Sequence, residues 1–138
     1  MTITVDWHDD DKSTIVVSQG ATWSWKEVRE SIDEAYTMVK GVDHIVYIIV
    51  DNSQATQNTA GSGLSTFRYA MENQPDNLAK LVVITDNRFM LPLPGVLEKA
   101  FAGAGAFAKM VGSKEEALAY IKEAKATGKA AASPSNGR

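Results

Sequence analysis

The most constraining feature of this sequence is an apolar run that stops at polar residues and is followed by a run of small ones. Residues 45–50 are nearly all β-branched, and the polar residues 51–53 end the run. Such a run favours a strand that is covered on both faces, as in a parallel or mixed sheet. Residues 58–69 then bring Thr59 and several small residues to the point where we expect a helix to begin. The sequence therefore predicts a strand-to-helix junction next to a buried strand.

The hydrophobic pattern elsewhere predicts alternating strands and helices. A period of two is typical of strands, whereas apolar residues spaced by three and four are typical of helices. Ser24 and Ser113 are each followed three residues later by Glu, which indicates a capping box at a helix start. Gly41 predicts a left-handed end to the first helix. In chain order we expect strand 3–7, strand 15–17, helix 24–40, strand 45–50, helix 60–73, strand 81–85, helix 92–101, strand 107–111 and helix 113–128.

This order predicts an α/β fold with a single mixed, mostly parallel sheet of about five strands and about four helices packed on it. The chain has 138 residues, which is too short for two ordinary domains. Residues 129–138 lack apolar periodicity and are rich in Ala, Ser, Pro, Asn and Gly. We therefore predict one domain over residues 1–128 and a flexible C-terminal tail over residues 129–138.

The composition narrows the classes of function. The chain contains no cysteine, which excludes disulfides, thiol catalysis and sulfur-ligated zinc. A net charge of -3 argues against nucleic-acid binding. The longest apolar run, residues 45–50, is far shorter than the ~20 residues of a membrane-spanning helix. The N-terminus has no signal-peptide character, so we expect a cytoplasmic protein without a membrane span.

Metal and cofactor sites are not indicated by the sequence. Residues 9–11 are three consecutive aspartates, but they lack the ligand spacing of a calcium loop, and we expect a solvated turn there. His8 and His44 stand alone. Trp7 and Trp25 fall on the apolar faces of predicted elements, so we interpret both as structural rather than as a ligand platform. We predict no cofactor and no metal.

The candidate site lies at the carboxyl edge of the predicted sheet. Open α/β sheets usually bind their ligands there, in the loops that follow the strands. Thr59 is the central candidate, although its local chemistry also fits a plain helix N-cap. The loops after the strands place the following residues at this edge: Asn52, Ser53, Thr59, Asp86, Arg88, Phe89 and Met90.

The junction also resembles the signature of the STAS family, the sulfate transporter and anti-sigma-factor antagonist domains, which reads Asp-Ser-Ser-Gly-Leu-Gly before a helix that often carries Arg-Tyr. Thr59 falls on the first Ser of that signature. The other matching positions are Asn58, Ala60, Gly61, Gly63, Arg68 and Tyr69. Weaker similarity continues through residues 81–85 and 107–121.

This resemblance implies a non-enzymatic regulatory module that binds a protein. In bacterial anti-sigma-factor antagonists the first Ser is phosphorylated by a kinase that is itself the anti-sigma factor, so Thr59 becomes a candidate phospho-acceptor. The same resemblance adds Asn58, Gly61, Ser62 and Gly63 to the expected partner-binding residues. The expected partner is an anti-sigma-factor-like or kinase-like protein.

The sequence leaves two other classes of function to consider. Residues 89–93 are unusually apolar for a loop and would suit a small apolar ligand, although ordinary packing before the third helix explains them as well. An enzyme is not indicated, because no nucleophile, general base and orienting group occur together. Fold alone does not choose among these functions.

Overall fold

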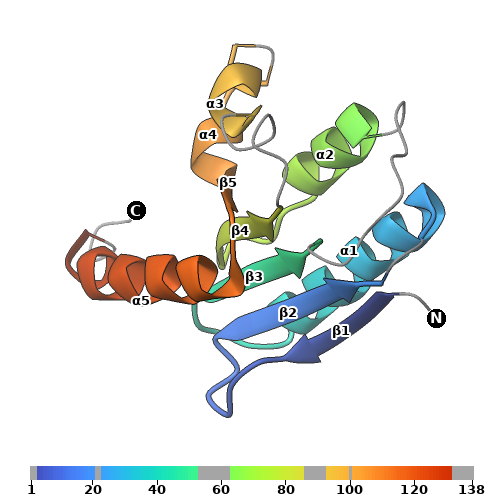
Figure 1. Ribbon diagram of the computed structural model, residues 1–138. Helices are drawn as coiled ribbons and strands as arrows, with labels where there is room; N and C mark the ends of the chain where they lie inside the picture. Colours follow the sequence, from blue (N-terminus) through green and yellow to red (C-terminus); the bar gives the residue numbers. More distant parts are fainter. Residues whose placement is uncertain (1–2, 21–22, 53–62, 86–92, 100, 132–138) are drawn as a thin grey trace.

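The computed structural model describes residues 3–20, 23–52, 63–85, 93–99 and 101–131. They form one five-stranded sheet with helices on both faces (Figure 1). The strands are β1 (Ile3–Trp7), β2 (Thr14–Gln19), β3 (Val46–Asp51), β4 (Leu78–Ile84) and β5 (Ala108–Val111). The helices are α1 (Trp25–Lys40), α2 (Gly63–Glu72), α3 (Leu93–Leu97), α4 (Ala104–Phe107) and α5 (Lys114–Ala131).

The strands lie in the sheet in the same order as in the chain, from β1 to β5. The first pair is antiparallel, with Val5 opposite Val17, and the other three pairs are parallel. This confirms the predicted α/β class and the mixed, mostly parallel sheet. Because parallel strands need crossover connections, the helices between them must pack on the faces of the sheet.

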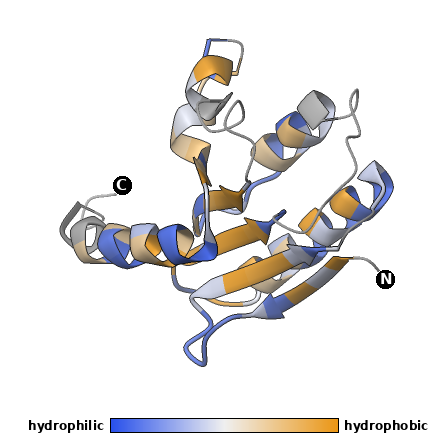
Figure 2. Ribbon diagram, viewed as in Figure 1, coloured by the Kyte–Doolittle hydropathy of each residue, from blue (hydrophilic) through white to orange (hydrophobic). Residues whose placement is uncertain are grey.

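The central strand β3 separates two apolar layers. Ile48 and Ile49 are neighbours in the chain, and strand geometry sends them to opposite faces, where each is at most 1% exposed. Ile48 belongs to the core under α1, α2 and α4, whereas Ile49 belongs to the core under α5. Figure 2 shows the strands as the most hydrophobic part of the fold. The prediction of a strand covered on both faces is confirmed.

The start of α1 follows the predicted capping box, but its end does not follow the prediction. The Ser24 hydroxyl accepts the N–H of Glu27, and the Glu27 carboxylate accepts the N–H of Ser24. Gly41, however, has a φ of -78°, which is right-handed. Its N–H donates to the carbonyls of Thr37 and Met38, so a tightened last turn ends the helix and no left-handed glycine is needed.

The helix expected over residues 92–101 is shorter than predicted, because α3 ends at Leu97, and a second short helix, α4, follows where no helix was expected. Gly103 has a φ of +96° and turns the chain between them. The Glu98 carboxylate accepts the N–H groups of Gly103 and Gly105, each at 2.8 Å, and so fixes that turn. As a result Phe107, which was expected to open the last strand, ends α4 instead.

Two element boundaries also differ from the prediction. β4 begins at Leu78, where the chain leaves the turn after α2 and the Leu78 N–H donates to the carbonyl of Pro75. α5 continues through Gly128 to Ala131, beyond the predicted end of the helix. A helix-interior glycine costs only about 1 kcal/mol relative to alanine, and the neighbouring Ala and Lys residues are strong helix formers.

Candidate functional site

Two backbone hydrogen bonds align the ends of the strands at the carboxyl edge of the sheet. The N–H of Asn52, just after β3, donates to the carbonyl of Ile84 at 3.1 Å. The N–H of Thr85, just after β4, donates to the carbonyl of Val111 at 2.9 Å. The chain therefore leaves β3, β4 and β5 from neighbouring points, as the prediction of a common edge requires.

Only two of the predicted site residues belong to the part of the chain that the structure describes. Asn52 lies at the carboxyl edge, and Gly63 lies in the first turn of α2. The other predicted site residues lie outside the described residues: Ser53, Asn58, Thr59, Gly61, Ser62, Asp86, Arg88, Phe89 and Met90.

Asn52 carries an unusual side-chain oxygen. Its Oδ1 is shielded from solvent and has no hydrogen-bond partner among the residues that the structure describes. A buried acceptor without a donor costs about 1–3 kcal/mol, so native structures seldom keep one without a reason. The carboxyl edge therefore presents an acceptor that a donor would stabilise.

The Arg-Tyr pair of the predicted signature is described, and both side chains contact the chain's own residues. Arg68 pairs with Glu72 on the same helix at 2.9 Å. The Tyr69 hydroxyl donates to Asp33 of α1 at 2.5 Å, and the Arg29 guanidinium lies 4.4 Å from the centre of the Tyr69 ring. The hydrogen bond to Asp33 raises the pKa of Tyr69. Tyr69 thus joins α2 to α1.

A second contact between these helices is buried. The Tyr36 hydroxyl donates to the carbonyl of Ala70 at 2.7 Å. Burial raises the pKa of Tyr36, and the neighbouring Tyr69 adds to the shift. Because this carbonyl belongs to the last turn of α2, where intrahelical partners run out, Tyr36 satisfies an acceptor that the helix cannot. This bond joins the end of α2 to α1.

Two tryptophans at the start of α1 also lie toward the carboxyl edge, because α1 follows the end of β2. The rings of Trp23 and Trp25 meet edge to face, with 4.8 Å between their centres. Both are partly buried and pack against the core, which agrees with the structural role expected for Trp25. This pair was not expected near the site, although its position directly after a strand was the available signal.

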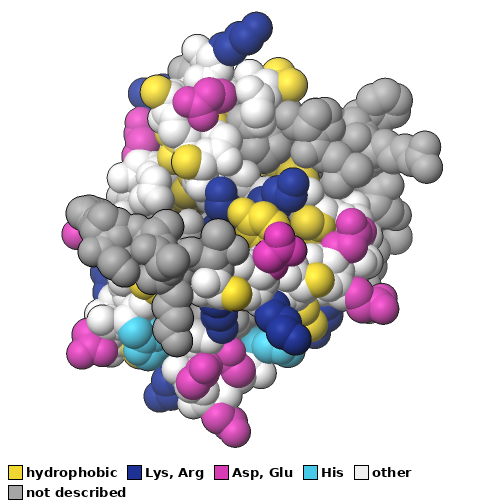
Figure 3. All heavy atoms as spheres, turned by 90° about the vertical axis from the view of Figure 1, so that its left-hand side faces the viewer, with side chains coloured by type: hydrophobic (Ala, Val, Ile, Leu, Met, Phe, Trp, Pro, Cys, Tyr) yellow, Lys and Arg dark blue, Asp and Glu magenta, His cyan; other side chains and the backbone are white. Residues whose placement is uncertain are grey.

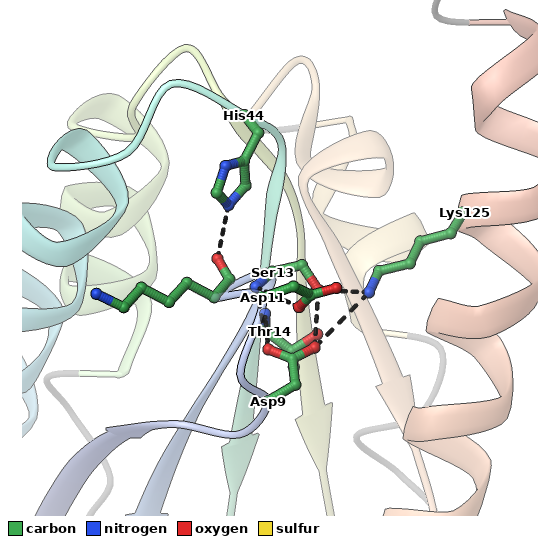
Figure 4. A network of polar contacts seen from close by, with 7 residues as sticks. Asp9, Asp11, Ser13, Thr14, His44 and Lys125 are labelled. Atoms are coloured by element: carbon green, nitrogen blue, oxygen red, sulfur yellow. Dashed lines mark hydrogen bonds and ion pairs between the residues drawn. The ribbon is translucent and has the colours of Figure 1, made fainter.

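The opposite, amino edge of the sheet holds the clearest polar network (Figure 4). The Ser13 hydroxyl donates to Asp9 at 2.8 Å and accepts from Lys125 of α5 at 2.6 Å. The Asp9 carboxylate also accepts the N–H groups of Ser13 and Thr14. Partial burial raises the pKa of Asp9, but the hydrogen bonds from Ser13 and Thr14 outweigh it and hold the pKa below its usual range.

This network is suited to stabilising a turn rather than to catalysis. The N–H groups of Ser13 and Thr14 would be needed to stabilise an oxyanion beside the Ser13 hydroxyl, and both already bind Asp9. Asp11 also accepts the N–H of Ser13. No cluster of three or more potential metal ligands occurs among the described residues. The acidic run forms a hydrogen-bonded turn.

Surface features elsewhere are polar and mixed in charge. On the face shown in Figure 3, acidic and basic side chains are interspersed around small apolar patches. An open depression at the amino edge is polar, and its lining residues are Lys40, Glu72, Asn73, Gln74, Pro75, Asp76 and Asn77. This depression does not correspond to the apolar pocket considered for residues 89–93, of which 89–92 lie outside the described residues.

The chain was compared with protein families, curated proteins and solved structures. No family model matches it, and neither a curated protein nor a solved structure matches it. Within the described residues, no helix combines the length and apolar character needed to cross a membrane.

Proposed function

We propose that this protein is a non-enzymatic regulatory module that binds a protein partner through the carboxyl edge of its sheet, in the manner of an anti-sigma-factor antagonist. The observation that carries the proposal is the pair of backbone bonds from Asn52 to Ile84 and from Thr85 to Val111. They bring the exits of β3 and β4 together. The segment with the STAS-like signature follows Asn52, and the segment containing Arg88 follows Thr85.

The proposed switch is phosphorylation of Thr59 by the partner. A phosphate adds about -1.5 to -2 charges near neutral pH, together with strong acceptor oxygens. The phosphate would repel a negatively charged partner surface. Against an apolar partner surface, the phosphate would lose its water, at a cost in free energy. Phosphorylation at Thr59 would therefore release the partner.

The phospho-acceptor is tested by incubating the protein with ATP and a lysate of its native cells. Intact mass and peptide mapping should show one phosphate in the wild type and in Thr59→Ser, but none in Thr59→Ala. Ser62→Ala is the matched control, because it removes a neighbouring hydroxyl and should leave phosphorylation unchanged. Undiminished phosphate in Thr59→Ala would exclude Thr59 as the acceptor.

The binding surface is tested with proteins recovered from the same lysate by cross-linking. Thr59→Glu and Arg88→Glu should each weaken binding of the recovered partner by at least tenfold, about 1.4 kcal/mol. Lys122→Glu, on an exposed position of α5, should bind like the wild type. Equal weakening by Lys122→Glu would place the interface elsewhere. Recovery of an apolar small molecule in place of a protein would favour the ligand-binding alternative.

A further inference from the structure

Among the described residues, β1 is an edge strand, and nothing in this part of the chain pairs with its outer side. β1 is the first strand of the sheet, and no described strand lies beyond it (Figure 1). The His8 N–H donates to the carbonyl of Thr14, which fixes the phase of the antiparallel ladder. Because bonding alternates along such a ladder, Thr4 and Asp6 bond to β2, and the N–H and C=O groups of Val5 and its alternate neighbours point outward.

One side of this edge is bordered by α1. Tyr36 and Asp33 of α1 contact α2, and Val28 and Val39 face the sheet. α1 contacts α2 and also β1. Residues spaced by three and four lie along one side of a helix, and on the side of α1 away from α2 Ser31 is buried, Met38 packs against the core and Glu34 is exposed.

The two sides of the edge differ, because the α1 side is largely apolar and the other side carries acidic groups. On the α1 side, Val5 and Trp7 are only partly buried and pack against the core, and Glu34 of α1 is exposed. On the other side of the sheet, the Asp6 side chain is exposed in the middle of the strand. The aspartates at positions 10 and 11 of the following turn are exposed too.

We propose that the open edge of β1 binds an extended basic segment of another protein, which adds a strand to the sheet. Backbone groups of the segment would pair with those of Val5 and Trp7, as in other complexes formed by strand addition. Alternate side chains of the segment would be apolar, against Val5 and Trp7, and basic, beside Asp6. This inference concerns a different edge from the proposed partner site and does not depend on it.

A second copy of this chain is a poorer occupant. The protein has a net charge of -3, and pairing β1 with its own copy would bring two acidic borders together. Like charges placed across an interface oppose association, whereas Lys and Arg beside the same carboxylates favour it.

The probe for the experiment is a short synthetic peptide of alternating valine and lysine, titrated into the full chain while backbone amide NMR signals are followed. The largest shifts should occur at Ile3, Val5 and Trp7. Two control peptides separate the contributions. One replaces lysine with glutamate, and the other keeps lysine but carries methyl groups on alternate backbone nitrogens, which prevents strand pairing.

Three variants complete the test. Val5→Pro removes an outward N–H and leaves the β1–β2 ladder intact, so it should abolish binding while the protein still unfolds cooperatively. Asp6→Lys and Glu34→Lys should each weaken binding roughly three- to fivefold, and added salt should reduce that difference. Lys122→Glu should change nothing.

The proposal is overturned by any of several results. These are absence of binding by the valine–lysine peptide, equal binding by either control peptide, and equal binding by folded Val5→Pro. A dimer of the wild type that Val5→Pro dissociates would show that the edge binds a second copy, and would also overturn it. If Val5→Pro fails to fold, the backbone-methylated peptide alone decides.

Discussion

Lys125 and Ser13, which are 112 residues apart in the chain, are joined by a hydrogen bond of 2.6 Å between Nζ and Oγ. Lys125 also lies 3.9 Å from the Asp9 carboxylate. The bond connects the second half of α5 to the turn between β1 and β2, at the edge of the sheet opposite the proposed partner site (Figure 4). α5 is thus held both by its apolar face and by a polar contact near its end.

Replacing Lys125 with Met should loosen α5 without unfolding the protein. Met keeps most of the apolar stem and removes the charged donor. Because the Lys125 side chain is 40% exposed, the loss of unfolding free energy should be no more than about 1 kcal/mol. Amide hydrogen exchange should become faster in the second half of α5, whereas Lys122→Met should leave it unchanged. Identical exchange in the two variants would mean that the contact does not hold the helix.

Asp9 should make stability depend on pH in the acid range. Its pKa in the folded protein lies below the ordinary value of 3.8, so the unfolded chain binds the proton more readily. The stabilisation is therefore fully present above that ordinary value and is lost as pH falls through the lower pKa of the folded state. Urea unfolding of the wild type and Asp9→Asn should differ most near neutral pH and converge in acid. Asp10→Asn, at an exposed position, should follow the wild type throughout; a gap for Asp9→Asn that is constant with pH would contradict the assignment.

A carboxylate at position 48 should destabilise the fold far more than one at position 45. Ile48 is 1% exposed in the layer under α1 and α2, whereas Ile45 is 49% exposed just before β3. Burying an unpaired charge costs several kcal/mol, which is comparable to the whole stability of many domains. Ile48→Asp should fail to fold, and Ile45→Asp should unfold near the wild-type temperature. Similar thermal unfolding of the two variants would mean that the core is placed wrongly.

The parts of the fold that the sequence predicts well depend on neighbouring residues. The capping box of Ser24 and Glu27 spans one helical turn. The apolar run of β3 by itself indicates a strand that is buried on both faces. The short helix α4 was missed because the turn that precedes it depends on Glu98 reaching the N–H groups of Gly103 and Gly105. A glutamate followed by a glycine-rich stretch is consistent with either arrangement.

The candidate site also has features that the sequence predicts and features that depend on contacts between distant residues. The shared carboxyl edge on which Asn52 lies follows from the alternation of strands and helices, and was predicted. The order of the strands within the sheet was not predicted. The buried oxygen of Asn52 and the contact of Tyr69 with Asp33 depend on how segments far apart in the chain pack together. Residue type alone carries no signal for either.

Removing the Tyr36 hydroxyl should weaken the contact between α1 and α2. Tyr36→Phe keeps the buried ring but leaves the carbonyl of Ala70 without its donor, which should cost about 1 kcal/mol. The measurement is the urea midpoint of unfolding. Tyr120→Phe is the control, because Tyr120 is partly exposed on α5 and keeps its ring beside Lys109. An equal change in both variants would show that the Tyr36 hydroxyl has no particular role.

The two glycines near α3 and α4 should respond to alanine in opposite directions. Gly103 has a φ of +96°, where a side chain is strained even though open space surrounds it, so Gly103→Ala should lower stability by about 1–2 kcal/mol. Gly95 lies within α3, also with open space around it and without a positive φ, so Gly95→Ala should raise stability by about 0.5–1 kcal/mol through better helix propensity. Thermal unfolding of the two single variants and their combination measures both effects. A gain in stability for Gly103→Ala would show that no left-handed turn at this position separates the two helices.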